Sequence, residues 1–550
     1  MDLAAEVDVR ERIIIVGGVA GGASAAARAR RVNEEADIVV YERGPYVSFA
    51  NCGLPYYIAG EITEVSKLMV ATPELFKTKY RVEVKIEHEV LNLDPVQRKI
   101  QVRGSDGVIF EDRYDKLILS QGANPLKPPF PGLDQNHVFT LRDIPDMLRI
   151  DSYIEEKEVK TAAVVGGGFI GLEVAEAFHR RGVEVHLVER APHVMPMIDA
   201  DMAEVFQNGI INHGGIHIHT ASSLESIQEK SITLEGGTSL PADVVLLSIG
   251  VAPEVGLAKE AGLKIGKTGG VQVNGRMESS YPDIYAVGDA AETVHRITGQ
   301  RVRIPLAGPA NRQGRVAGEN AAGGHANYVG ALGTSIVRVH DQQLAITGLG
   351  ENQAEVSGLS FYRSTTKDLS HAGYYPGAKA VTSRLLVEEG TGRLLGAQVL
   401  GEDGVDKRID VYATAIAAGM TVDQLDDLDL AYSPPFGSAI DAVNTAGRVA
   451  SHVRSGELRT LQPDQVTSFD GQIVDVREVA EREKGYVENS IHIPLGELRD
   501  KLEVLDPELS VLVYCAKGLR GYLGTRILRQ RGFRVFNLDG GYDRYQHSVS

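Results

Sequence analysis

The chain has only two cysteines among its 550 residues. So few thiols exclude a disulfide framework and are typical of a protein from a reducing compartment. Each cysteine nevertheless lies in a sequence that suits sulfur chemistry. Cys52 stands in the segment SFANCGLPYY (residues 48–57), and Cys515 opens the loop CAKGLR after a short apolar run. The local sequence therefore favours two reactive thiols over two inert core residues.

The chain also has no tryptophan, and no apolar run approaches the ~20 residues that span a bilayer. Residues 1–6 are acidic and lack the basic-then-apolar pattern of a secretory signal, so we expect a soluble cytoplasmic protein. The net charge of −17 argues against nucleic acid as a partner, because phosphate contacts need clustered basic residues. A small anionic substrate in a local basic pocket is compatible with this charge.

A first dinucleotide-binding pattern occupies residues 13–42. An apolar strand leads into the turn GGVAGG, an alanine-rich helix and a second strand that ends at Glu42, although Val19 replaces the usual second glycine. In such a βαβ unit the helix N-terminus faces a pyrophosphate and the terminal acid accepts ribose hydroxyls. The cofactor-binding candidates of this unit are Gly17, Gly22, Glu42 and Arg43.

The pattern recurs over residues 162–189, where GGGFIG follows an apolar strand and carries all three fingerprint glycines. Glu189, at the end of the next strand, would bond both ribose hydroxyls of NAD and repel the 2′-phosphate of NADP. Arg190 follows directly and softens that preference, so NADH is favoured and NADPH stays open. The candidates of this second unit are Gly166, Gly168, Gly171 and Glu189.

Two such units in one chain indicate one for a flavin and one for the nicotinamide that reduces it. Residues 114–123 have the pattern of a strand that returns to a glycine turn, and residues 281–290 that of a strand ending in a Gly-Asp pair. Asp289 in that pair could bond the ribityl hydroxyls of FAD, and the simpler alternative is an ordinary helix cap.

With these motifs, residues 10–450 resemble the FAD-dependent pyridine nucleotide–disulfide oxidoreductases, and most of all the coenzyme A-disulfide reductases. SFANCGLPYY, HAGYYPG (371–377) and AYSPP (431–435) carry this resemblance. Residues 462–550 resemble a rhodanese domain through VDVR, the Cys515 loop and NLDGGY. The combination is similar to NADH-dependent persulfide reductases.

The resemblance implies an α/β chain with two Rossmann-like dinucleotide-binding domains, an α+β dimerisation domain with a strand at 394–400, and a C-terminal α/β rhodanese domain. A homodimer and no metal site are expected. The implied domains are FAD-binding at 10–122 and 251–330, NAD(P)H-binding at 123–250, dimerisation at 331–452, a linker at 453–464 and rhodanese at 465–550.

Cys52 has no cysteine within five residues, and the other cysteine lies in another predicted domain. The second sulfur of a redox disulfide must therefore come from the substrate. Cys52 stands where a helix would begin, which favours its thiolate. By resemblance it lies against the flavin, where a mixed disulfide with a small thiol could be reduced.

Coenzyme A is the expected thiol. Ser24, Arg28 and Arg31 are spaced i, i+4, i+7 and share one helix face, although a solvated basic face is the simpler alternative. By resemblance this face borders the coenzyme A channel. The further substrate-binding candidates are Ser48, Asn51, Lys77 and Lys79.

Tyr374 and Tyr432 resemble tyrosines that reach the active site from the partner subunit, where a phenol could stabilise a departing thiolate. The sequence does not separate Tyr374 from Tyr375. No lysine follows Tyr432 in residues 436–441, where coenzyme A-disulfide reductases often have one, and this argues against strict specificity for that disulfide.

The six-residue loop from Cys515 to Arg520 can direct successive N–H groups at one sulfur, which stabilises a thiolate or persulfide. Lys517 and Arg520 would add positive charge for an anion such as thiosulfate. We therefore expect NAD(P)H-dependent reduction of coenzyme A persulfide, polysulfide or coenzyme A disulfide, with a rhodanese domain that handles sulfane sulfur. The alternatives are an NADH oxidase or peroxidase that cycles Cys52 through a sulfenic acid, and a redox or sulfur sensor without turnover.

Overall fold

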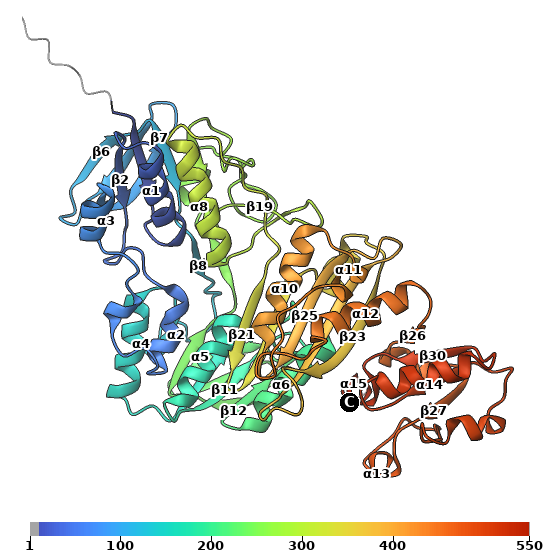
Figure 1. The fold of residues 1–550 in the computed structure, drawn as a ribbon. Coiled ribbons are helices and arrows are strands. Elements are labelled where there is room, and N and C mark those ends of the chain that lie inside the picture. The colour runs from blue at the N-terminus through green and yellow to red at the C-terminus, as the bar shows by residue number, and fades with distance from the viewer. Residues whose placement is uncertain (1–9, 549–550) are drawn as a thin grey trace, which may run out of the picture. The chain divides into compact units, whose positions relative to one another are not determined.

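The computed structural model describes residues 10–548 (Figure 1). They divide into two compact units, one formed by residues 10–190 and 215–333 and the other by residues 191–214 and 334–548. In this described part of the chain, every helix is too short or too polar to cross a membrane. Parallel and antiparallel sheets alternate with helices in both units, which confirms the predicted α/β class.

The first unit contains two parallel five-stranded sheets. One has the order β18-β7-β1-β2-β3 and the other the order β12-β11-β10-β16-β9. The apolar runs after residues 12 and 161 form the central strands and are almost fully buried, as strands covered on both faces require. The strands are β1 Arg12–Val16, β2 Asp37–Tyr41, β3 Glu83–Lys85, β7 Lys116–Leu119, β18 Ile284–Ala286, β9 Val138–Phe139, β10 Thr161–Val165, β11 Glu184–Val188, β12 Ile216–His219 and β16 Val244–Leu247.

Two helices of this unit, α1 and α5, begin at the glycine turns. Helix α1, Ala20–Val32, packs on α8, Ala307–Ala321, where a Cβ at Gly314 would overlap the backbone of Gly21. Helix α5, Phe169–Arg180, begins directly after Gly168, which caps it in an extended conformation. The other helices are α2 Leu54–Ile58, α3 Pro73–Tyr80, α4 Ile144–Glu156 and α7 Gly256–Glu260.

Small antiparallel sheets complete the first unit. Their strands are β4 Glu89–Asp94, β5 Lys99–Arg103 and β6 Ile109–Arg113; β13 Leu224–Gln228, β14 Ser231–Leu234 and β15 Ser239–Pro241; β8 Ala123–Pro125 with β17 Val251–Pro253; and β19 Thr293–Val294 with β20 Arg301–Val302.

The second unit has an antiparallel sheet of order β21-β22-β25-β24-β23. The strand predicted at residues 394–400 is β25, and all of its residues are buried. The strands are β21 Ser335–Val339, β22 Gln342–Gly348, β23 Phe361–Leu369, β24 Ala380–Glu388 and β25 Leu394–Gly401. The helices are α6 Ala200–His213, α9 Glu351–Val356, α10 Val405–Ala418, α11 Val422–Asp426 and α12 Ala442–Arg454.

A parallel sheet of order β26-β30-β29-β27-β28 ends the chain. Its first strand lies within residues 453–464, so the segment predicted as a linker contributes a strand that pairs with β30. The strands are β26 Thr460–Leu461, β27 Gln472–Asp475, β28 Ile491–His492, β29 Val511–Tyr514 and β30 Val535–Leu538, and the helices are α13 Val479–Arg482, α14 Leu519–Arg529 and α15 Gly541–Ser548.

Asp475 at the end of β27 is fully buried and organises this last sheet. Its carboxylate accepts hydrogen bonds from the guanidinium groups of Arg477 and Arg482 and from the hydroxyl of Tyr514. Although burial opposes ionisation, the hydrogen bonds and charge of Arg477 hold the pKa of Asp475 below its usual range. This stabilisation is therefore present above the ordinary carboxyl pKa and is lost as the pH falls through the lowered one.

We expect Asp475→Asn to destabilise this domain by about 3 kcal/mol, because it leaves buried guanidinium charge without its carboxylate. Hydrogen-exchange mass spectrometry of β27 and β29 in a urea series measures this. The exposed Asp506→Asn is the matched control, and equal urea midpoints for the two variants would contradict the assignment.

Candidate functional site

Both glycine turns require the absence of a side chain. Gly17 and Gly166 have φ values of +94° and +111°, and a Cβ at either would overlap a carbonyl oxygen of the neighbouring strand end. A Cβ at Gly22 or Gly171 would overlap the carbonyl oxygen of the first glycine of its own turn. At Gly168 a Cβ would meet no atom within 4 Å. Each turn thus brings backbone N–H groups and a helix N-terminus to an open edge of its sheet.

An acid lies beside each turn, as the βαβ pattern predicts. Glu42 Oε2 accepts a hydrogen bond of 2.8 Å from the N–H of Gly18. Glu189 Oε2 accepts one of 2.7 Å from the N–H of Gly167. Arg43 follows Glu42 and donates to Asn124 Oδ1 over 3.2 Å. The acids and turns therefore form two separate, matching nucleotide-binding geometries.

Asp289 lies in a short 3-10 turn, residues 288–290, directly after β18. Its side chain is half-buried, and burial raises the pKa of its carboxyl against the opposing charges of Arg303 and Arg142. A desolvated carboxyl of this kind is suited to bind a hydroxyl donor. The first glycine turn, Glu42 and Asp289 together fit the pyrophosphate, ribose and ribityl groups of FAD.

Cys52 lies in the 3-10 turn Asn51–Gly53, immediately before α2, and its side chain is exposed. The expected lowering of its thiol pKa by a helix start is wrong. Partial desolvation raises the pKa of the Cys52 thiol, and the carboxylates of Glu173 and Asp289 raise it further. Helix α2 has only five residues, so it offers Cys52 only a short run of aligned peptide dipoles.

Glu173 is a site residue that the sequence analysis missed. It stands on α5, two residues after the last fingerprint glycine, and accepts a 3.4 Å hydrogen bond from the Tyr56 hydroxyl. Burial raises the pKa of Glu173 to about 7. Its sequence signal is an acid two residues after the last fingerprint glycine, in the second turn of α5, a position that helix-capping arguments do not cover.

The predicted basic face of α1 is divided between two partners. The Arg28 guanidinium donates to Glu319 of α8 over 2.6 Å, so its charge is offset, and Ser24 Oγ donates to Asn311 over 2.8 Å. Arg31 instead lies 5.6 Å from the centre of the Tyr80 ring, and Lys79 of α3 lies 5.4 Å from the same ring. We name Arg31, Lys79 and Tyr80 the basic cluster.

The remaining substrate-binding candidates differ in accessibility. Lys77 and Asn51 are exposed, and Asn51 Nδ2 donates to the carbonyl of Arg142 over 3.4 Å. Ser48 is buried in the left-handed region with a φ of +49°. Its N–H donates to the carbonyl of Gly18 over 2.9 Å, so Ser48 joins the Cys52 segment to the first glycine turn.

Tyr374 and Tyr432 come together in the second unit, with their hydroxyl oxygens 2.7 Å apart. Tyr375 instead packs edge-on against His371, with ring centres 5.6 Å apart. The structure thus distinguishes two tyrosines that the sequence does not, and it pairs Tyr374 with Tyr432. Lys407 of α10, which the sequence analysis missed, donates to the carbonyl of Phe436 over 3.3 Å in the segment that lacks a lysine of its own.

Cys515 is buried at the end of β29, and its Sγ accepts a 3.1 Å hydrogen bond from the N–H of Gly518. Gly518 has a φ of +133°, which favours glycine and turns the loop into α14. Lys517 is exposed. The loop thus directs the N–H of Gly518 at the sulfur, which is one of the successive N–H groups that the sequence predicts there.

Arg520 differs from the expectation of a positive charge available for an anion. Its guanidinium donates two hydrogen bonds of 2.6 Å to the carboxylate of Glu481 on α13. Glu481 is a third residue that the sequence analysis missed, because it lies 39 residues away from Arg520 in the chain. An anionic substrate at Cys515 has to share Arg520 with this acid.

Since Glu173 is ionised above about pH 7, its charge opposes formation of the Cys52 thiolate in that range. We expect Glu173→Gln to move the pH midpoint of Cys52 alkylation by iodoacetamide to lower pH. Glu184→Gln, an exposed change in the same unit, serves as the control. A midpoint that stays or rises in Glu173→Gln would contradict the assigned electrostatics.

Comparisons with known proteins agree with this geometry. Residues 11–314 match the pyridine nucleotide-disulphide oxidoreductase family, residues 334–443 its dimerisation domain, and residues 457–548 the rhodanese-like domain. The chain is 36% identical over 442 residues to a CoA-dependent NAD(P)H sulfur oxidoreductase of Pyrococcus furiosus, which covers 80% of this chain and 99% of that one. It is 35% identical to a coenzyme A disulfide reductase of Staphylococcus haemolyticus, over 79% and 98% of the two chains.

Two solved structures resemble the chain over nearly its whole length. The reduced CoADR-RHD of Bacillus anthracis has a TM-score of 0.97 and 42% identity, with 98% of each chain covered. An NAD-dependent persulfide reductase from A. fulgidus has a TM-score of 0.91 and 38% identity, over 97% of this chain and 100% of that one. The resemblance stated from the motifs is confirmed, and with it the expected FAD and NAD(P)H cofactors. The chain belongs to the pyridine nucleotide–disulphide oxidoreductase family and carries a dimerisation domain and a C-terminal rhodanese domain.

Proposed function

We propose that this protein uses NAD(P)H and FAD to reduce coenzyme A persulfide, and related polysulfides or coenzyme A disulfide, through Cys52. One observation carries the proposal. Cys52 lies within the electrostatic influence of Asp289, the residue that we assign to the flavin, and the other cysteine, Cys515, follows a strand of a different sheet and accepts a hydrogen bond from the N–H of Gly518. A redox disulfide at Cys52 therefore takes its second sulfur from the substrate.

The chemistry at Cys52 balances in two steps. The Cys52 thiolate attacks the sulfur attached to coenzyme A and forms a Cys52–coenzyme A mixed disulfide. The sulfur–sulfur bond of the persulfide breaks, and hydrosulfide is the leaving group. Reduction of this disulfide takes two electrons and one proton and returns the coenzyme A thiol and the Cys52 thiolate. FAD held by the first glycine turn, Glu42 and Asp289 would supply those electrons from NAD(P)H. Glu173 has a pKa near neutrality and is suited to exchange a proton at this site.

The remaining candidates have roles in the same reaction. The basic cluster and Lys77 supply positive charge for the phosphates of coenzyme A. In a homodimer, we assign the hydroxyl pair of Tyr374 and Tyr432 to the Cys52 site of the other subunit, where a phenol donates to the leaving sulfur.

Cys515 supplies the sulfane sulfur in this proposal. Its thiolate attacks the outer sulfur of a donor such as thiosulfate, sulfite leaves, and a Cys515 persulfide forms. The coenzyme A thiol then takes the outer sulfur and becomes the persulfide that Cys52 reduces. A peroxidase that uses Cys52 as a sulfenic acid would leave both the Cys515 loop and the basic cluster without a role.

The first experiment compares coenzyme A persulfide, coenzyme A disulfide and hydrogen peroxide as oxidants for NADH, with hydrosulfide release measured in parallel. Hydrosulfide release in step with NADH consumption supports the proposal. Faster turnover of peroxide would favour the peroxidase alternative, and no steady NADH consumption with any acceptor would favour a sensor.

We expect Cys52→Ser to lose NADH-dependent persulfide reduction because it removes the attacking thiolate, while thiosulfate sulfurtransferase activity at Cys515 stays at the parent level. Cys515→Ser is the matched control. It should lose thiosulfate sulfurtransferase activity and keep NADH-dependent reduction of coenzyme A persulfide when that persulfide is supplied. A Cys52→Ser protein that reduces persulfide at the parent rate would contradict the proposed attack by Cys52.

We expect Glu481→Gln to lower KM for thiosulfate by roughly two- to fivefold, the scale of one partly exposed ion pair, because it frees the Arg520 charge for the anion. Steady-state sulfurtransferase kinetics measure this. The exposed Glu483→Gln, on the same segment, is the control. An unchanged or higher KM in Glu481→Gln would show that Arg520 does not meet the donor.

A further inference from the structure

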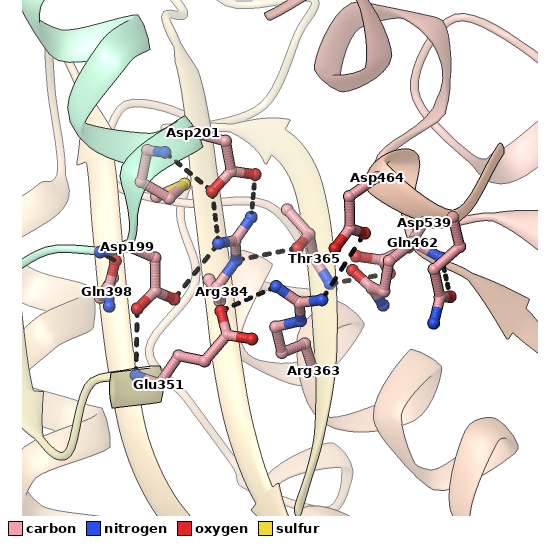
Figure 2. A network of polar contacts seen from close by, with 12 residues as sticks. Asp199, Asp201, Glu351, Arg363, Thr365, Arg384, Gln398, Gln462, Asp464 and Asp539 are labelled. Atoms are coloured by element: carbon pink, nitrogen blue, oxygen red, sulfur yellow. Dashed lines mark hydrogen bonds and ion pairs between the residues drawn. The ribbon is translucent and has the colours of Figure 1, made fainter. Parts of the chain in front are cut away.

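A buried network of charged side chains joins the rhodanese domain to the antiparallel sheet of the second unit (Figure 2). Arg384 of β24 is only 2% exposed and donates to both oxygens of Asp201, over 2.6 and 2.5 Å, and to Asp199 over 3.2 Å. Both aspartates lie at the start of α6. We call Asp199, Asp201, Arg384, Asp539 and Arg544 the junction network.

The rhodanese side of the junction network comes from the end of β30 and from α15. Arg544 donates to Asp201, and also to Asp539 over 2.5 Å and to Gln462 over 2.7 Å. Asp539 in turn accepts a 3.1 Å hydrogen bond from the backbone N–H of Thr365 on β23. Two guanidinium groups thus share three carboxylates that have little access to solvent, so each ion depends on the others for its solvation.

The first turn of α15 also holds the Cys515 loop from behind. The N–H of Tyr542 donates to the carbonyl of Cys515 over 2.8 Å, and the N–H of Asp543 to that of Ala516 over 3.0 Å. Gly541 permits this approach, because a Cβ there would lie 2.6 Å from both carbonyl oxygens. In a trans peptide the N–H is opposite the C=O, so the following two N–H groups of the loop point away from α15.

The same residues of α15 thus have two sets of partners. Asp543 holds the loop with its N–H and pairs with Lys367 of β23 through its carboxylate, over 2.9 Å. Arg544, the next residue, enters the junction network. A shift of the antiparallel sheet therefore displaces α15 through these contacts. The N–H groups of Tyr542 and Asp543, which hold the peptides of the Cys515 loop, then move with α15.

We propose that the first turn of α15 makes sulfur transfer at Cys515 depend on the docking of the rhodanese domain against β23 and β24. Asp543 and Arg544 are positioning residues, since they act through the loop backbone and touch neither Cys515 Sγ nor the anion. The inference rests on the proposed sulfur-transfer role of Cys515.

Lys367→Glu in the full-length holoenzyme tests this, because it places a like charge against Asp543 from outside the rhodanese domain. We expect kcat for thiosulfate sulfur transfer to fall roughly three- to tenfold, the scale of coupling through packed elements. KM should change less than about twofold, because Lys517 and Arg520 are untouched. Lys367→Arg, which keeps the positive charge, should have the parent kcat. Arg393→Glu, a charge reversal in another exposed ion pair of the same sheet, should also leave kcat unchanged.

Arg544→Met provides a second, stronger change, with circular dichroism to show that the variant folds. Iodoacetamide labelling of Cys515, read by mass spectrometry, should slow in both Lys367→Glu and Arg544→Met. Parent kcat and parent labelling in Lys367→Glu would overturn the coupling, whatever Arg544→Met does. Absence of sulfur transfer in the unmodified protein would instead refute the role of Cys515, and the labelling rates would still test the coupling.

Discussion

The close approach of backbone to backbone at a few glycines is the constraint on which both halves of this protein depend. At Gly22 and Gly171 a side chain would overlap the carbonyl oxygen of the first glycine of the same turn. Only glycine therefore lets α1 and α5 begin close enough to the turn to present their N-termini to a nucleotide. At Gly541 the same requirement lets α15 reach the carbonyls behind Cys515. The nucleotide-binding turns and the Cys515 loop thus both rest on positions with no side chain.

The acidic character of the chain shapes its basic sites. Arg28 is offset by Glu319, Arg520 by Glu481, and Arg384 by two aspartates. Arg31 and Lys79 gather instead around an aromatic ring. Positive charge is therefore mostly offset by acids and is concentrated at the basic cluster. This suits a substrate with phosphate groups at one end and a reactive sulfur at the other. Glu481 makes binding of an anion at Cys515 compete with an internal ion pair.

The two cysteines have opposite surroundings. Cys52 is exposed but faces two carboxylates that raise the pKa of its thiol, so its reactivity depends on what is bound beside it and on the charge of Glu173. Cys515 is buried, its Sγ accepts a hydrogen bond from the N–H of Gly518, and the carbonyls of Cys515 and Ala516 are held by N–H groups of α15, so we propose that backbone orientation controls its reactivity. One site is therefore governed by side-chain charge and the other by backbone geometry.

The sequence by itself determined the α/β class, the two glycine turns with Glu42 and Glu189, and the strand at β25, because these depend on local patterns within about 30 residues. The roles of the two cysteines stay predictions from their local segments. Tertiary structure alone decided that Tyr374 and not Tyr375 pairs with Tyr432, that Glu173 faces Cys52, that Glu481 holds Arg520, and that Asp201 joins two arginines of distant segments. These partners lie tens to hundreds of residues apart, and burial sets both their charge state and the strength of their contacts. A pattern read along one chain contains no information on such distances.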